Sequence, residues 1–113
     1  KNEMNIEENL NELEESIENN FNKTQFEKEV FDLINHLSTV EDILRLASII
    51  RWAPYENEDN AIETALNITD RAIEKSVESN NKEELETIID ELEMSMELDD
   101  RANEVREIVE NLD

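Results

Sequence analysis

The sequence predicts an all-α protein, a small antiparallel bundle of five or six helices around a central apolar helix at about residues 39–53. The 113-residue chain has no Gly and one Pro, so β-hairpins and Gly-rich phosphate loops have little to build on. Apolar residues recur every three or four positions along most of the chain, as in amphipathic helices. The length suits one modest core, so we expect residues 1–113 to form a single helical domain.

The central helix is predicted from residues 38–54, the most apolar stretch of the chain. Residues 38–41 read S-T-V-E, the spacing of a capping box, which predicts the helix start. Pro54 lacks an N–H and disfavours a helical Ala53, so the helix should end near Trp52. The apolar positions cover most of the circumference, so other segments must surround this helix. They are Val40, Ile43, Leu44, Leu46, Ala47, Ile49 and Ile50.

Two helices are expected before the central one. Residues 5–20 carry a narrow apolar stripe with glutamates around it, which suits a docking or dimerisation arm. The stripe consists of Ile6, Leu10, Leu13 and Ile17. Residues 24–27, T-Q-F-E, have capping-box spacing, so the second helix should begin at Thr24, with Phe31 on its apolar face. The capping box at residues 38–41 would then leave a turn of one or two residues before the central helix.

Further helices are expected after Pro54. One should run from about residue 61 to a turn at Asn80 and Asn81, and Asn81 should cap the next helix three residues before Glu84. A break or kink is expected at residues 98–100, L-D-D, although one continuous helix over residues 82–112 is an alternative. The string D-R-A occurs at residues 70–72 and again at residues 100–102, so a helical-repeat origin is a further alternative.

Net charge is the most unusual property of the sequence. The chain has 32 acidic and 10 basic residues, a net charge of −22, whereas a magnitude of roughly 2 to 8 suffices to keep a small domain soluble. Residues 82–113 carry thirteen acids and three bases, and residues 23–53 carry five and four. Such a chain should not bind nucleic acid or an anionic bilayer, because both require cationic surface. We therefore expect a basic partner protein.

A partner-binding surface is predicted on the C-terminal helices, where several acids point away from the apolar faces. Acids three or four residues apart on a helix are separated by about 4.5 to 6 Å along its axis. This is of the same order as the spacing of about 3.4 Å between phosphates on one nucleic-acid strand. The predicted residues are Glu83, Asp90, Glu91, Met94, Glu97, Glu107 and Glu110, with Met94 as an apolar anchor. The alternative is an ordinary solvated face.

The sequence offers little for catalysis or metal binding. It has no Cys, and its single His36, one helical turn from Asp32, has no nucleophile motif beside it. No Glu-x-x-His pair and no Gly-containing calcium loop occur. We expect no enzyme activity, no cofactor and no metal. No apolar run reaches membrane-spanning length, and the first residues lack the apolar part of a signal peptide, so a cytoplasmic location is expected.

In composition the chain resembles the acidic nucleic-acid mimics that phages and mobile elements use against restriction or CRISPR nucleases, and the immunity proteins that neutralise nuclease toxins. This resemblance covers the whole chain and implies an inhibitor that blocks the basic groove of a nucleic-acid-binding enzyme. The alternative is a non-enzymatic helical scaffold, adaptor or helical-repeat interaction module. It could form a homodimer through the stripe of residues 5–20.

Overall fold

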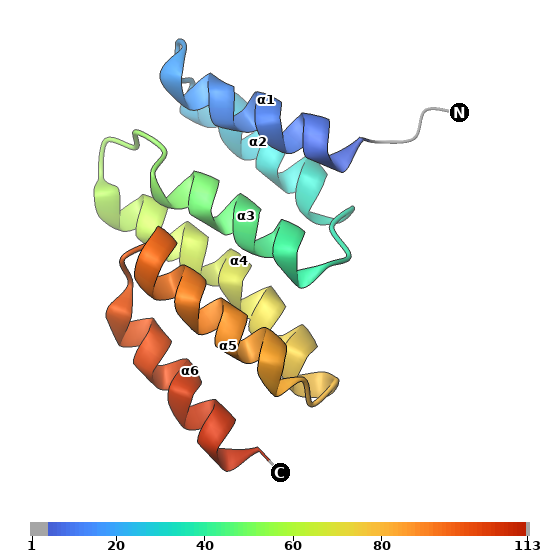
Figure 1. Ribbon diagram of the computed structural model, residues 1–113. Helices are drawn as coiled ribbons and strands as arrows, with labels where there is room; N and C mark the ends of the chain where they lie inside the picture. Colours follow the sequence, from blue (N-terminus) through green and yellow to red (C-terminus); the bar gives the residue numbers. More distant parts are fainter. Residues whose placement is uncertain (1–4, 113) are drawn as a thin grey trace.

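The computed structural model describes residues 5–112, and within this range the chain is helical and contains no strand (Figure 1). This confirms the predicted all-α class. The helices are α1 (Ile6–Glu18), α2 (Lys23–Ile34), α3 (Val40–Arg51), α4 (Glu58–Glu78), α5 (Lys82–Asp90) and α6 (Asp99–Asn111). A five-residue π-helical turn, η1 (Glu91–Ser95), continues α5.

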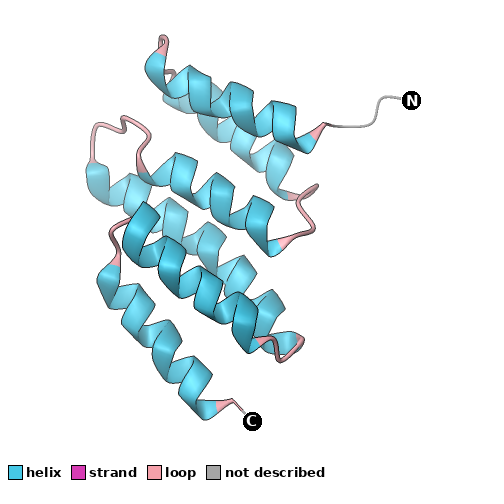
Figure 2. Cartoon of the chain, in the orientation of Figure 1, coloured by secondary structure: helices cyan, strands magenta, loops and turns pink. Residues whose placement is uncertain are grey.

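Consecutive helices pack as the pairs α1–α2, α3–α4 and α5–α6, and the pairs lie side by side (Figure 1). The described part of the chain measures 45 × 38 × 17 Å, so it is a thin slab rather than a sphere. Loops occur only at the helix ends (Figure 2). Helix α3 contacts α1, α4 and η1, which places it in the middle of the stack.

Helix α3 is the centre of the core, as predicted. Leu46, Ala47 and Ile50 have no exposed surface, and most other α3 side chains are also buried. At its end Ala53 is buried, whereas Trp52 remains 47% exposed. The broad apolar circumference read from the sequence is therefore used almost completely for packing inside the chain.

Asn and Thr side chains cap helices α1 to α5, and three of the predicted starts are wrong. Asn57 accepts the N–H of Asp59, so α4 begins at Glu58 and not at about residue 61. Asn22 accepts the N–H of Gln25, so α2 begins at Lys23 and not at Thr24. Asn is at least as good a cap as Thr and comes first along the chain. Thr39, rather than Ser38, accepts the N–H of Asp42, so residues 35–39 separate α2 from α3, more than the predicted turn of one or two residues. The cap predicted at Asn81 is confirmed by its bond to the N–H of Glu84.

The turns are built without Gly. Asn20 and Asn80 adopt positive φ, as short amide side chains readily do. Glu97 also has a φ of 57°, which is unfavourable for a residue of its type. It follows η1, and the N–H of Leu98 then bonds to the carbonyl of Leu92. This confirms the predicted break near residue 98 and excludes one continuous helix over residues 82–112.

An aromatic cluster connects the α1–α2 pair with the loop that follows α3. Phe21, Phe26 and Tyr55 lie with ring centroids 5.2 to 6.2 Å apart. The Tyr55 hydroxyl donates a hydrogen bond of 3.0 Å to Glu27. Burial raises the pKa of Tyr55, and the bond to Glu27 adds to this effect. The loop after α3 is thereby held against α2.

The apolar face of α2 differs from the prediction at Phe31, whereas α1 docks on the core, one of the two roles expected for its stripe. Phe31 is 70% exposed, so its predicted place on the apolar face of α2 is wrong: Val30, Leu33 and Ile34 supply that face. In α1, Leu10 and Leu13 are buried, and Ile6 and Ile17 pack against the same core. This packing explains the stripe within one chain, and a homodimer through it remains a prediction.

Candidate protein-binding surfaces

The acidic residues predicted to bind a partner do not form one row. All are exposed except Glu91, which is half-buried. Asp90 and Glu110 line a groove of about 400 Å³ between α5 and α6. Glu83 lies with Glu41 at the junction of α3 and α5. The structure therefore distributes the predicted residues over several surfaces.

An arginine interrupts the acidic face of α5 and α6. Arg106 lines the same groove as Asp90 and Glu110, and its guanidinium lies 2.6 Å from Glu93. The hydrogen bond from Arg106 lowers the pKa of Glu93. The same bond raises the pKa of Arg106, and the charges of Asp90 and Asp99 add to it. A positive charge thus lies inside the surface predicted to imitate a row of phosphates.

A larger groove, which the sequence did not reveal, runs along α3 between α1 and the end of α5. We call it the α3 groove. Its volume is about 690 Å³. Its lining comprises Glu41, Leu44, Arg45, Ser48, Ile49 and Trp52 of α3 and its C-cap, Glu14, Ile17 and Glu18 of α1, and Thr87, Glu91 and Ser95 of α5 and η1. The α3 positions recur at three and four residues, so they form one helical face.

The α3 groove combines apolar residues with several carboxylates. Leu44, Ile49 and Ile17 supply apolar surface, and the acids are Glu14, Glu18, Glu41 and Glu91. Arg45 is the only basic residue among the described residues of the lining, and it forms an ion pair of 3.1 Å with Glu14 and a hydrogen bond with Asn11. Among the described residues, Glu18, Glu41 and Glu91 have no ion-pair partner. Three carboxylates of this groove are thus available to an incoming cation.

Trp52 closes one end of the α3 groove in a fixed position. Its indole N–H donates a hydrogen bond of 2.7 Å to the carbonyl of Ser95 in η1. The guanidinium of Arg51 stacks on the indole at 4.1 Å from the ring centre. Arg51 itself is buried and donates to the Met96 carbonyl at 2.8 Å, and it pairs with Glu58 at 3.0 Å. The contacts of Arg51 and Trp52 therefore hold α3, η1 and α4 together.

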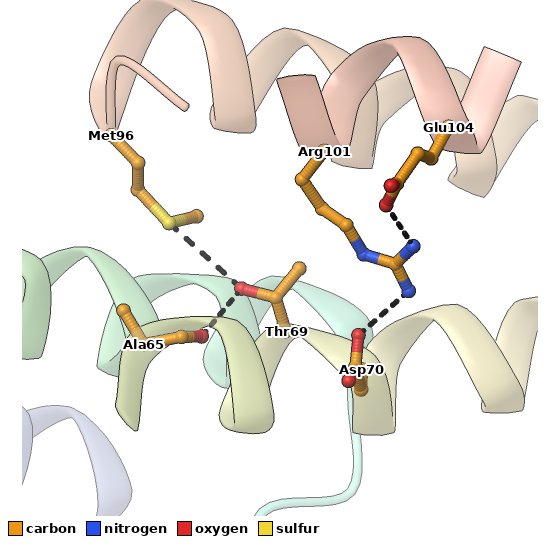
Figure 3. A network of polar contacts seen from close by, with 6 residues as sticks. All are labelled: Ala65, Thr69, Asp70, Met96, Arg101 and Glu104. Atoms are coloured by element: carbon orange, nitrogen blue, oxygen red, sulfur yellow. Dashed lines mark hydrogen bonds and ion pairs between the residues drawn. The ribbon is translucent and has the colours of Figure 1, made fainter. Parts of the chain in front are cut away.

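A second set of polar contacts holds α6 and the turn before it on α4 (Figure 3). Arg101 lies 2.8 Å from Asp70 of α4 and 2.6 Å from Glu104. The buried Thr69 hydroxyl donates to the Ala65 carbonyl and lies 3.8 Å from the sulfur of Met96. Asp70 and Arg101 belong to the two D-R-A strings, so the recurring residues meet in space.

One polar atom in the α3 groove has no partner. The Oγ atom of Ser48 is buried, yet it makes no hydrogen bond within the described part of the chain. Buried hydroxyls are nearly always hydrogen-bonded. Ser48 belongs to the lining face of α3, but its Oγ atom is itself covered by protein atoms.

The remaining candidate sites show no arrangement for chemistry. His36 and Asp32 are both exposed, and among the described contacts no hydrogen bond or ion pair joins their side chains. Residues 5–112 contain no group of three or more His, Asp or Glu placed to hold a metal. In the same range, no helix has the length and apolar character needed to cross a membrane.

Comparison with known proteins leaves the function to be argued from this geometry. No family model, no curated protein and no solved structure matches the chain. The features on which a function can rest are the excess of acidic residues, the stacked helix pairs and the two grooves.

Proposed function

We propose that the protein is an acidic inhibitor that imitates nucleic acid and blocks the basic groove of a nucleic-acid-binding enzyme, of the anti-CRISPR, anti-restriction or nuclease-immunity type. The observation that supports this most is that its carboxylates are not buried and that few of them form ion pairs. The chain carries 32 acids, and no Asp or Glu is buried within the described residues. Five carboxylates form ion pairs in that range. The remaining charge is unmatched and faces solvent.

The mechanism would be stoichiometric competition. Lys and Arg side chains that hold phosphates would instead meet fixed carboxylates, and the enzyme could no longer bind its substrate. Long-range attraction between the −22 chain and a basic groove should make association fast and strongly dependent on salt. The expected partner is therefore a basic protein, and the expected location is the cytoplasm, where such enzymes meet nucleic acid.

Displacement of labelled DNA from purified nucleases tests the proposal. A panel of restriction, CRISPR and toxin nucleases would be titrated with the protein at low and moderate salt. Polyglutamate of matched total charge controls for charge alone. We expect displacement from at least one nuclease at near-equimolar protein, weaker at the higher salt, while polyglutamate needs a large excess. If no nuclease responds better to the protein than to polyglutamate, nucleic-acid mimicry is wrong.

The stacked helix pairs favour a second candidate, a helical scaffold or repeat-type interaction module. Such a module would bind a partner without displacing nucleic acid. A pull-down at two salt concentrations, followed by a nucleic-acid binding assay on each captured protein, separates the two candidates. Sedimentation tests the predicted dimer, because the single chain has a mass of 13.3 kDa.

A further inference from the structure

The α3 groove has the length and composition of a docking site for a helix. Its lining face on α3 runs from Glu41 to Trp52. At a rise of 1.5 Å per residue this face is about 16 Å long, or about three helical turns. A helix that docks in a groove typically inserts apolar side chains at positions i, i+3, i+4 and i+7, which span about two turns. The groove is therefore long enough for one such stripe.

The charges of the groove define the chemistry of the occupant. Glu18 comes from α1 on one side, and Glu91 comes from the end of the α5 segment on the other. Between them lie Leu44 and Ile49 of α3. An occupant that matches this pattern has an apolar stripe with Lys or Arg on both of its flanks. A neutral apolar helix would leave the carboxylates unpaired, and an acidic helix would be repelled.

We infer that the α3 groove binds a basic amphipathic helix of a partner protein. In this complex the apolar stripe packs mainly on the half-buried Ile17 and touches the small exposed parts of Leu44 and Ile49, and the flanking cations pair with Glu18, Glu41 and Glu91. Trp52 packs against one end of the bound helix. The inference rests on the proposed function in naming a basic partner, and it adds which face of the protein makes the contact.

The groove between α5 and α6 is less suited to the same occupant. It is smaller, with a volume of about 400 Å³ against about 690 Å³, and no aromatic side chain occurs among its described lining residues. Each groove contains one arginine that is already paired, Arg45 with Glu14 and Arg106 with Glu93. Each also has three carboxylates without ion pairs among the described residues, so its size and the fixed Trp52, rather than free charge, favour the α3 groove.

A pair of synthetic peptides provides the probe. The first is a 14-residue helix-forming peptide with leucines at i, i+3, i+4 and i+7 and lysines on both flanks. The second has the same residues, with the leucines distributed around the helix. Trp52, the only Trp and half exposed in the groove, reports binding by its fluorescence. We expect the striped peptide to change this fluorescence and to bind at least tenfold more tightly than the control peptide.

Matched variants locate the contact. The double variant Glu18→Gln with Glu91→Gln removes two free carboxylates of the α3 groove, and Glu107→Gln with Glu110→Gln removes two exposed carboxylates of α6. We expect about a tenfold loss of affinity for the first and less than a twofold loss for the second. Ser48→Leu fills the groove and should abolish binding. The glutamine variants change only side chains that are at least partly exposed, so they keep the test valid if Ser48→Leu does not fold.

Equal binding of the two peptides, or equal losses in the two double variants, would show that charge alone drives binding and would overturn the inference. The peptide assay contains no nucleic acid, so its outcome is separate from that of the proposed inhibitor function. If the striped peptide binds in the groove while no nuclease loses its DNA, the docking site is supported and nucleic-acid mimicry is wrong. If nucleases are inhibited and the striped peptide does not bind, nucleic-acid mimicry is supported and the docking site is wrong.

Discussion

The α3 groove and the groove between α5 and α6 are both acidic, yet they differ in size and in the side chains that border them. The α3 groove has a volume of about 690 Å³ and includes Trp52, which is fixed by its hydrogen bond to the Ser95 carbonyl. The groove between α5 and α6 has a volume of about 400 Å³, and Arg106, paired with Glu93, lies among its acids. Both contain carboxylates without ion pairs among the described residues, so the comparison teaches that a count of acids does not identify a binding surface. The size of the groove and an aromatic side chain in a fixed position distinguish the two.

The largest expected effect concerns the buried core side of α3. Ile50→Ala removes a fully buried side chain of α3 and should lower the free energy of unfolding by about 2 to 5 kcal/mol. Ile108→Ala makes the same change at a half-buried position of α6 and should cost clearly less. Urea unfolding measures both. Equal losses would mean that α3 is no more central than α6.

The second comparison concerns the loss of stability when a buried arginine or an exposed arginine is replaced. Arg51→Met leaves the Met96 carbonyl without its donor and removes the contact with Trp52, so we expect a loss of about 1 to 3 kcal/mol and a shifted Trp52 emission. Arg106→Met breaks an exposed ion pair and should cost clearly less, because water screens such a pair. Urea unfolding followed by Trp fluorescence tests both variants. If Arg106→Met costs as much as Arg51→Met, the α5–α6 face is more rigid than its exposure indicates.

Glu97 offers a stabilising change. Its φ of 57° is costly for a glutamate but not for Gly, so Glu97→Gly should raise the free energy of unfolding by about 1 kcal/mol. Glu107→Gly, inside α6, removes an equal charge and should instead cost about 1 kcal/mol. Thermal melting of both variants provides the measurement. A loss of stability in Glu97→Gly would show that the Glu97 side chain contributes more than its backbone strain costs.

The smallest effects concern pH and salt. Because the pKa of Glu93 is lowered, its contact with Arg106 stabilises the fold fully above the ordinary Glu pKa of about 4.3, and this contribution is lost as the pH falls through the lower folded-state value. Repulsion among the other acids acts in the opposite direction. We expect the melting temperature to rise with added salt and as the pH is lowered moderately from 7, and then to fall in stronger acid. Arg106→Gln should reduce this final fall. A melting temperature that does not respond to salt would show that the acids repel one another little.

Local patterns in the sequence predicted most of the fold. The spacing of apolar residues in α3, the stop at Pro54 and the cap at Asn81 depend on neighbouring residues, so they can be read from the chain. The start of α2 and the exposure of Phe31 could not be read in this way. Two adjacent capping signals compete at residues 22–24. The side chain of a residue at the border of an apolar face, such as Phe31, can be either buried or exposed.

The candidate binding surface was less predictable because it depends on contacts between distant segments. Arg51 meets Met96, and Trp52 meets Ser95, more than forty residues away along the chain. Nothing in the local spacing of Glu18 or Glu91 shows that they border the same groove. The unusual Met94, predicted as an anchor, is 83% exposed and lies one residue from the groove wall at Ser95. The wide apolar face of α3 was the signal that could have indicated a groove on this helix.

Hydroxyl-radical footprinting of the protein with and without the striped peptide compares the two surfaces in one experiment. Trp52 reports on the α3 groove, Met94 reports on the anchor predicted for the C-terminal acidic surface, and the exposed Phe31 of α2 is the control. The account predicts that the peptide protects Trp52 most strongly and leaves Phe31 unchanged. Protection of Met94 with unchanged oxidation of Trp52 would contradict the account. It would show that the peptide binds at the C-terminal acidic residues instead.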